Sequence, residues 1–319
     1  MDQPKSLCPY VAGNSIALRL KTPHNEAQVD AKIVRIFEPF TLSCVMVVRI
    51  DCPALDLDGN DDIVLKVFDR RFAKQARDNY KMQPWSLELE KDYNHFISCE
   101  GGLEFANALP SGTEEPPRTQ DDLWNPSHEE AYLQFYLLGL YEAEKEAYQT
   151  LHDSQGKDVP RLIADVFISG GDTDFPQPHS QEFPGILLQH IKGFPLTDIT
   201  DHAPKELWQS ICDDAIRIIN LMGDKGILNE DVNTRSFIVD LDPEETLGFK
   251  VTMIDLALCS FRREYEDEQE WTESKAIEEE EEEAIGIVMQ HKLGGGFVYH
   301  RSVRYKKPAS YYEDGEGLE

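Results

Sequence analysis

The chain has 319 residues, of which 40% are hydrophobic and 29% are charged, so it is long enough for one large domain or two lobes. Its formal net charge of −29 disfavours nucleic acid and anionic membranes as partners, because like charges repel, and suits basic peptides or metal ions better. The same acidity also fits a plain role in solubility.

Targeting and cysteine patterns agree with an intracellular protein. The first residues lack an apolar signal segment, and no apolar run reaches the roughly 18 residues that cross a bilayer. The 6 cysteines form no C-x-x-C pair, which is typical of reduced thiols. The sequence therefore predicts a cytoplasmic or nuclear location without a membrane partner.

The first half of the chain begins with a weakly patterned lead-in over residues 1–30. Two strands are predicted within 31–50, joined by EPFTL, and a third in IVLKVFD at 63–69. Two helical pieces broken near Pro84 follow, and then a loop rich in proline and acidic residues. A long amphipathic helix is predicted from Ser127, as its N-cap, to about residue 153.

The second half opens with two strands, VPRLIADVFI and GILLQHI. A helix is predicted over 204–226, with Gly226 as its stop. Short strands in ILNEDV, SFIVDL and GFKVTMIDLAL come next, followed by a helix-like tail with a run of glutamates, Glu278 to Glu283. That run predicts a charged helix face or a loop rather than a metal site.

Four charged residues stand within or beside these apolar segments, namely Lys66, Glu144, Asp231 and Asp255. A nucleotide site needs a cation for the phosphates, an acid to orient it, a base near the acceptor hydroxyl and a carboxylate for magnesium. The four residue types occur in that order, so we expect them to converge. The alternatives stay open: Lys66 as a lysine snorkelling on a sheet face, Glu144 as a solvated helix acid, and the two aspartates as turn residues.

The motifs around these residues resemble protein kinases. VLKVFD resembles the strand that bears the phosphate-binding lysine, and EKEAYQTL resembles the helix whose glutamate pairs with it. GILNEDVNTRSFIV resembles the catalytic loop, and MIDLAL resembles the metal-binding strand. LKVFDRRFA at 65–73 is similar to a segment of divergent protein-kinase-like proteins common in fungi.

This resemblance implies an α+β, two-lobed protein-kinase-like fold. Residues 1–190 would form an N-lobe with an antiparallel sheet, an αC helix and an insertion near 70–130. Residues 191–319 would form a truncated, mainly helical C-lobe with an acidic tail.

The resemblance also implies site roles, with ATP and Mg²⁺ as cofactors. Lys66 would hold the phosphates and Glu144 would anchor Lys66. Asp231 would be the catalytic base, and Asp255 would bind the metal.

Two further parts of the site follow from the same resemblance. The backbone of Gln189 and Ile191 would face adenine. Ser236 stands where the family has the asparagine that holds a second metal.

The chain also departs from the kinase pattern. The segment 38–43 contains no glycine to bring backbone N–H groups close to phosphate. Asn229 replaces the usual histidine, Leu256 and Ala257 replace Phe-Gly, and no A-P-E motif follows. These departures put peptide substrates in question.

Three functions remain open on the sequence alone. The first is an ATP- and Mg²⁺-dependent phosphotransferase acting on a protein or a small hydroxylated acceptor. The second is a pseudokinase, a binding or scaffold module that keeps the fold and transfers little or no phosphate. The third is an unrelated α+β protein in which the spacings arise by chance.

Overall fold

The computed structural model describes residues 8–21, 26–109, 124–169, 182–241, 248–264, 267, 270–271 and 280–302. The chain divides into two compact units. The first unit holds residues 1–142 and 162–190, and the second holds 143–161 and 191–319. The loop was expected at 108–122, and its residues 110–122 lie outside the described residues.

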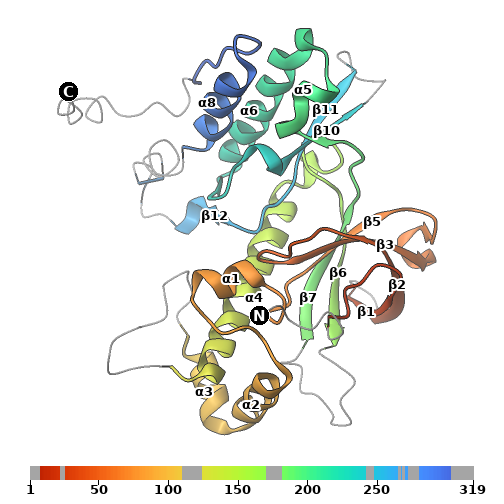
Figure 1. Ribbon diagram of the computed structural model, residues 1–319, viewed down its shortest axis with the longest axis vertical. Coiled ribbons are helices and arrows are strands. Elements are labelled where there is room, and N and C mark those ends of the chain that lie inside the picture. Colours follow the sequence, from red (N-terminus) through yellow and green to blue (C-terminus); the bar gives the residue numbers. More distant parts are fainter. Residues whose placement is uncertain are drawn as a thin grey trace, which may run out of the picture. The chain divides into compact units, whose positions relative to one another are not determined.

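The first unit is built on a closed antiparallel β-barrel of 6 strands (Figure 1). The ring runs in the order β1, β2, β3, β5, β7 and β6, and it closes because β1 pairs with both β2 and β6. A short seventh strand, β4, pairs with the end of β3. The strands of this unit are β1 (Ser15–Lys21), β2 (Glu26–Ile36), β3 (Cys44–Cys52), β4 (Leu57–Asp58), β5 (Ile63–Val67), β6 (Leu162–Ser169) and β7 (Glu182–Gln189).

The expected two-lobed protein-kinase-like fold is therefore wrong. That fold has an open N-lobe sheet with a single αC helix, whereas here the sheet is a closed barrel and the described residues form 7 α-helices. The physical reason is β1, which lies in the stretch predicted as a loose lead-in. Its side chains alternate between buried and exposed, and its backbone satisfies the free edges of β2 and β6.

The barrel interior is filled by apolar side chains, as expected for a ring of this size. Ile16, Leu18 and Leu20 of β1 are buried together with residues of the other ring strands. The remaining ring members of this core are Ala31, Ile33, Cys44, Met46, Val48, Ile50, Cys52, Ile63, Leu65, Val67, Val166, Ile168, Phe183 and Leu187.

The helices of the first unit follow β5 in sequence. They are α1 (Lys74–Asn79), α2 (Leu87–Ser98), α3 (Glu100–Asn107) and the first part of α4 (Pro126–Thr150). The break predicted near Pro84 separates α1 from α2, whose N-cap Ser86 accepts a hydrogen bond from the Leu89 amide at 3.1 Å.

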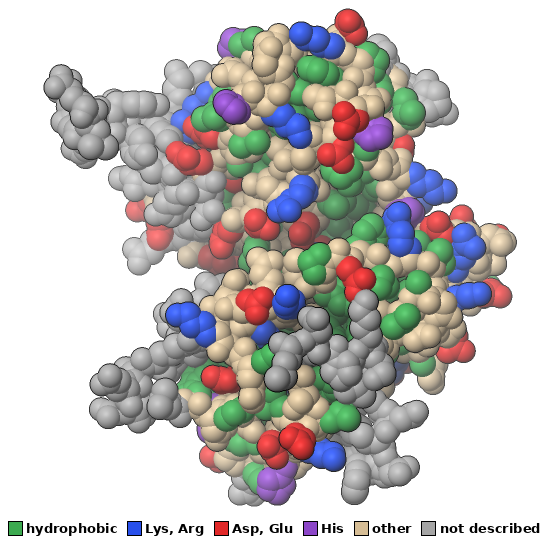
Figure 2. Space-filling model, in the orientation of Figure 1, with side chains coloured by type: hydrophobic (Ala, Val, Ile, Leu, Met, Phe, Trp, Pro, Cys, Tyr) green, Lys and Arg blue, Asp and Glu red, His purple; other side chains and the backbone are tan. Residues whose placement is uncertain are grey.

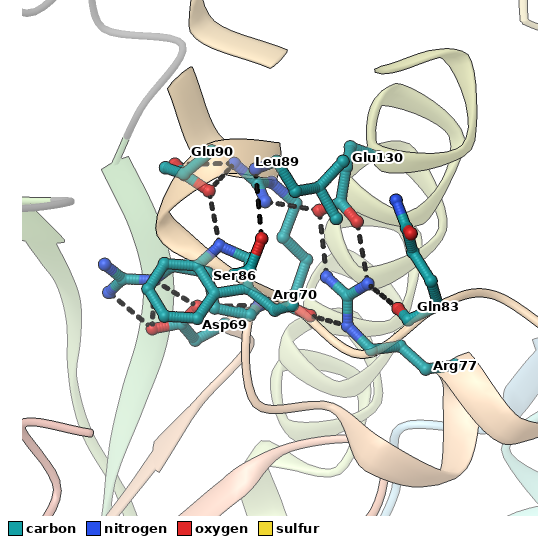
Figure 3. Close-up of polar contacts among 10 residues, drawn as sticks. Asp69, Arg70, Arg77, Gln83, Ser86, Leu89, Glu90 and Glu130 are labelled. Carbon is teal, nitrogen blue, oxygen red and sulfur yellow. Dashed lines mark hydrogen bonds and ion pairs between the residues drawn. The ribbon is translucent and has the colours of Figure 1, made fainter. Parts of the chain in front are cut away.

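A buried network of ion pairs ties these helices to the segment after β5 (Figure 3). Arg70 pairs with Glu90 of α2 at 2.8 Å and with Glu130 of α4. Arg77 of α1 donates to the two carboxylate oxygens of Glu130 at 2.7 and 2.9 Å. Beside it, Arg71 pairs with Asp69 at 2.7 Å. The LKVFDRRFA segment, cited above for its resemblance to kinases, thus supplies structural charges.

The N-terminus of α4 differs from the prediction in its capping residue. The side-chain oxygen of Asn125 accepts hydrogen bonds from the amides of Ser127 at 2.9 Å and His128 at 3.0 Å. Ser127, predicted as the N-cap, lies inside the helix and is buried. Asparagine and serine are about equally good caps, so composition alone does not separate the two positions.

The second unit contains most of the remaining helices and two small sheets. Helix α6 (Trp208–Asp224) lies beside α8 (Glu281–Leu293), and α5 (Ile199–His202) is a single turn (Figure 1). The first sheet has the order β11 (Phe249–Met253), β10 (Phe237–Leu241) and β8 (Phe194–Pro195). The second pairs β9 (Ile227–Asn229) with β12 (Cys259–Phe261).

Single turns of 3₁₀ helix join several of these elements in both units. They span Pro53–Leu55, His152–Ser154, Leu196–Asp198, Lys205–Leu207, Thr234–Ser236 and Arg262–Glu264.

The surface carries both signs of charge. Figure 2 shows Lys and Arg side chains interspersed with Asp and Glu on the face that it draws. Mixed charge of this kind is typical of a solvated surface. All 6 cysteines fall within the described residues, and none of them forms a disulfide.

Among the described helices, none combines the length and apolar character that a membrane span requires.

Candidate functional site

Two strand pairs of the second unit bring Asp231 and Asp255 into one region. In the first pair Asn229 of β9 lies opposite Cys259 of β12, and in the second Phe237 of β10 lies opposite Met253 of β11. The segments 230–236 and 254–258 both run between these two pairings. Each segment is therefore held at both ends against the other, and each carries one of the two aspartates.

A single buried side chain links the two segments. Asn229 is 1% exposed, and its amide nitrogen donates to the backbone oxygen of Asp255 at 3.2 Å. Its side-chain oxygen accepts from the backbone amide of Asp231 at 3.0 Å. One carboxamide thus fixes the backbone of both aspartates, and this residue was seen in the sequence only as a departure from the histidine of kinases.

Two backbone hydrogen bonds reinforce the same junction. The amide of Ile254 donates to the oxygen of Ser236 at 2.7 Å, and the amide of Glu230 donates to the oxygen of Leu258 at 2.8 Å. Ser236, expected at the second metal position, consequently lies next to the Asp255 segment. It is 4% exposed, whereas Asp231 and Asp255 are exposed.

Asp255 adopts an unusual backbone conformation. Its φ angle is 67°, in the left-handed region, where a residue other than glycine is strained by about 1 kcal/mol. The hydrogen bond from Asn229 to its carbonyl helps to hold this conformation. Observed strain of this kind is enriched at functional sites, so it makes Asp255 a candidate site residue.

Glu144 and Tyr148 lie one turn apart on the part of α4 that belongs to the second unit, and both are fully buried. Burial raises the pKa of the Tyr148 hydroxyl well above its usual range, and the negative charges of Glu144 and Asp255 raise it further. Tyr148 is therefore protonated at neutral pH and lies within electrostatic reach of both carboxylates. Within the described part of the chain, its hydroxyl has no hydrogen-bond partner.

The remaining candidates belong mainly to the first unit. Lys66 lies on β5 between Val45 and Ile186 of the neighbouring strands and is 6% exposed, with its ammonium 5.7 Å from the centre of the Phe68 ring. Gln189 ends β7, and Ile191 begins the next segment of the second unit. Contacts within the second unit thus define a cluster of four residues, Asn229, Asp231, Ser236 and Asp255. Tyr148 and Glu144 lie nearby.

The cluster offers a metal ion few protein ligands. Within the described ranges, no group of three or more His, Cys, Asp or Glu side chains is arranged to hold a metal. A cation at Asp231 and Asp255 would need most of its ligands from water or from a bound substrate.

No protein-family model matches the chain, and no curated protein matches its sequence. The resemblance to protein kinases therefore stays a prediction, and the case for a function depends on the geometry of this cluster.

Proposed function

We propose that the chain transfers the γ-phosphoryl group of ATP, with magnesium, to a hydroxyl acceptor on a protein or a small molecule. The observation that carries this proposal is the pair of exposed carboxylates, Asp231 and Asp255, whose backbones one buried asparagine holds together. The proposal does not depend on the fold expected from the sequence, because the same chemistry recurs on unrelated folds.

Magnesium fits the residues that are present. It prefers oxygen ligands, keeps several waters, and is usually bound through one or two carboxylates together with substrate phosphates. Asp255, with its exposed carboxylate, would be the metal ligand, and Ser236 has little exposed surface to contribute. When bound, the ion would neutralise charge on the phosphate oxygens.

The protein's own part in the reaction is assigned to Asp231. The acceptor hydroxyl oxygen forms a bond to the γ-phosphorus of ATP, the bond from that phosphorus to the bridging oxygen breaks, and ADP leaves. The hydroxyl proton passes to the Asp231 carboxylate, which therefore acts as a general base. The hydrogen bonds of Asn229 hold the backbone of Asp231 close to that of Asp255.

The roles expected for Lys66 and Glu144 remain predictions. The contacts within each unit do not by themselves give either residue a part in nucleotide binding. Both side chains are buried, and buried ionisable groups are common at functional sites.

The test is magnesium-dependent release of ADP from ATP by the full chain. Asp231→Asn and Asp255→Asn keep the size of each side chain, and each is expected to lower turnover by about 100-fold or more. Asp213→Asn is the matched control, because Asp213 is an exposed acid on α6 that accepts a hydrogen bond from Gln209. Turnover in both site variants equal to that of the wild type would refute the proposal.

A second candidate is a binding module that holds a nucleotide without transferring phosphate. The burial of Ser236 favours it, because the second metal position then lacks an exposed ligand. This candidate predicts that ATP with magnesium raises the melting temperature, since a ligand of the native state at 100 times its Kd adds about 2.7 kcal/mol, while no ADP appears. Ser236→Asn would then be the variant in which to look for new turnover.

A further inference from the structure

The glutamate run of the tail ends in the first turn of α8, where its members are not a solvated face. Glu281 is 2% exposed, and Glu282 is buried as well. Acids are favoured at the N-terminus of a helix by the helix dipole, yet burial of a carboxylate is costly unless the group is hydrogen-bonded. The burial of Glu281 therefore calls for a partner outside its own helix.

That partner is the candidate site. A carboxylate oxygen of Glu281 accepts a hydrogen bond from the backbone amide of Asn229 at 3.0 Å. Asn229 in turn bonds the backbone of Asp231 and of Asp255 through its side chain. Three residues from distant parts of the chain are thus joined through Asn229, and Glu281 holds the strand end from which the carboxamide projects.

We propose that Glu281 is a positioning residue for the Asp231 and Asp255 pair, an inference that rests on the proposed function. Its side-chain oxygen accepts from a buried backbone amide, and removal of the acceptor would leave that amide without this hydrogen bond, which is costly in a buried site. Outer residues that orient the groups in contact with a metal or substrate typically change activity by about 10- to 100-fold when they are replaced. Glu281 acts on the two aspartates through Asn229 and is not itself a catalytic residue.

The neighbouring glutamates have other partners. Glu282 accepts a hydrogen bond from the backbone amide of Ser302 at 2.9 Å, and Glu283 pairs with Arg301 at 2.5 Å. Both contacts hold the segment that follows α8, not the loop that carries Asp231. Glu283 therefore provides a control of the same residue type in the same helical turn.

The experiment measures kcat and KM for ATP in the full chain and in variants at these positions. Glu281→Ala is expected to lower kcat by about 10- to 100-fold with little change in KM, because it disturbs the geometry of the carboxylates. Glu281→Gln keeps an oxygen that can accept the same hydrogen bond and is expected to restore most of kcat. Glu283→Ala is expected to behave like the wild type. This rescue and this split between kcat and KM would not arise from a general loss of stability.

Two results would overturn the inference alone: turnover that Glu281→Ala leaves unchanged, or equal losses in the alanine and glutamine variants. Should the alanine variant fail to fold, Glu281→Asp replaces it, because the shorter side chain keeps the charge and no longer reaches the Asn229 amide. Wild-type activity in that variant would count against the inference. Absence of magnesium-dependent turnover in the wild type itself would refute the proposed function and this inference together.

Discussion

Removal of Glu130 tests the buried network of the first unit. Its carboxylate is almost fully buried and takes three hydrogen bonds, one from Arg70 and two from Arg77. Burial alone would lower the pKa of Arg70, but the charges of Glu130 and Glu90 outweigh that effect and raise it. Replacement of Glu130 by alanine therefore removes a buried carboxylate partner from both arginines.

The loss of unfolding free energy depends on the hydrogen-bond partners that each arginine keeps. Arg70 retains Glu90, and Arg77 retains, among the described residues, the backbone oxygens of Arg70 and Gln83. Loss of one partner of a buried ion pair costs about 3 to 5 kcal/mol, so we expect Glu130→Ala to lower the free energy of unfolding by about 3 kcal/mol. At about 2 to 4 °C per kcal/mol, the melting temperature falls by about 6 to 12 °C.

Urea unfolding followed by tryptophan fluorescence measures this change. Trp85 is a local reporter, because its ring nitrogen donates to Glu90 at 2.7 Å. The control is Glu88→Ala, an exposed acid of α2, expected to cost less than about 0.5 kcal/mol. In the double variant Glu130→Ala with Arg77→Ala, the loss of unfolding free energy should be smaller than the sum of the losses in the two single variants, because the two side chains interact. A loss below about 1 kcal/mol in Glu130→Ala would refute the reasoning.

Three further predictions concern single side chains. Asn125→Ala should cost about 1 kcal/mol of unfolding free energy and Ser127→Ala less, as measured by urea titration; the reverse order would contradict the capping assignment. Tyr148→Phe removes a buried hydroxyl without a hydrogen-bond partner and should raise unfolding free energy by about 1 kcal/mol, whereas a loss of that size would show that the hydroxyl is bonded. Burial raises the pKa of Cys212 to about 12, so at pH 8 this thiol should stay protonated and resist a thiol reagent, while the exposed Cys99 reacts. Peptide mapping of the label measures the difference, and equal labelling of the two cysteines would be inconsistent with the burial of Cys212.

The strands of the barrel were predictable where the sequence alternates. The runs at 31–50 and 63–69 gave β2, β3 and β5 to within a few residues at their ends. The closure was not predictable, because it depends on which edges β1 pairs with, and pairing partners leave no local pattern. Without β1 the same strands suggested an open sheet, which agreed with the kinase-like fold that the motif resemblance implied.

The sequence pointed to the two aspartates of the candidate site, but not to the hydrogen bonds that link them. Asp231 follows GILNE and precedes a predicted strand, and Asp255 ends the strand-like run VTMID. Asn229 gave no signal of its role, since its two hydrogen bonds depend on the register between β9 and β12. Glu281 was hidden in a run of like residues, and only tertiary structure separates the member that faces the loop from those that do not.

The closed ring of six strands also affects how copies of the first unit can associate at high concentration. A sheet with open sides exposes unpaired amides and carbonyls that can recruit another chain. In this ring each strand already has a neighbour on both sides, so its backbone offers no template for strand addition. Strand addition to the ring itself would therefore require the barrel to open first.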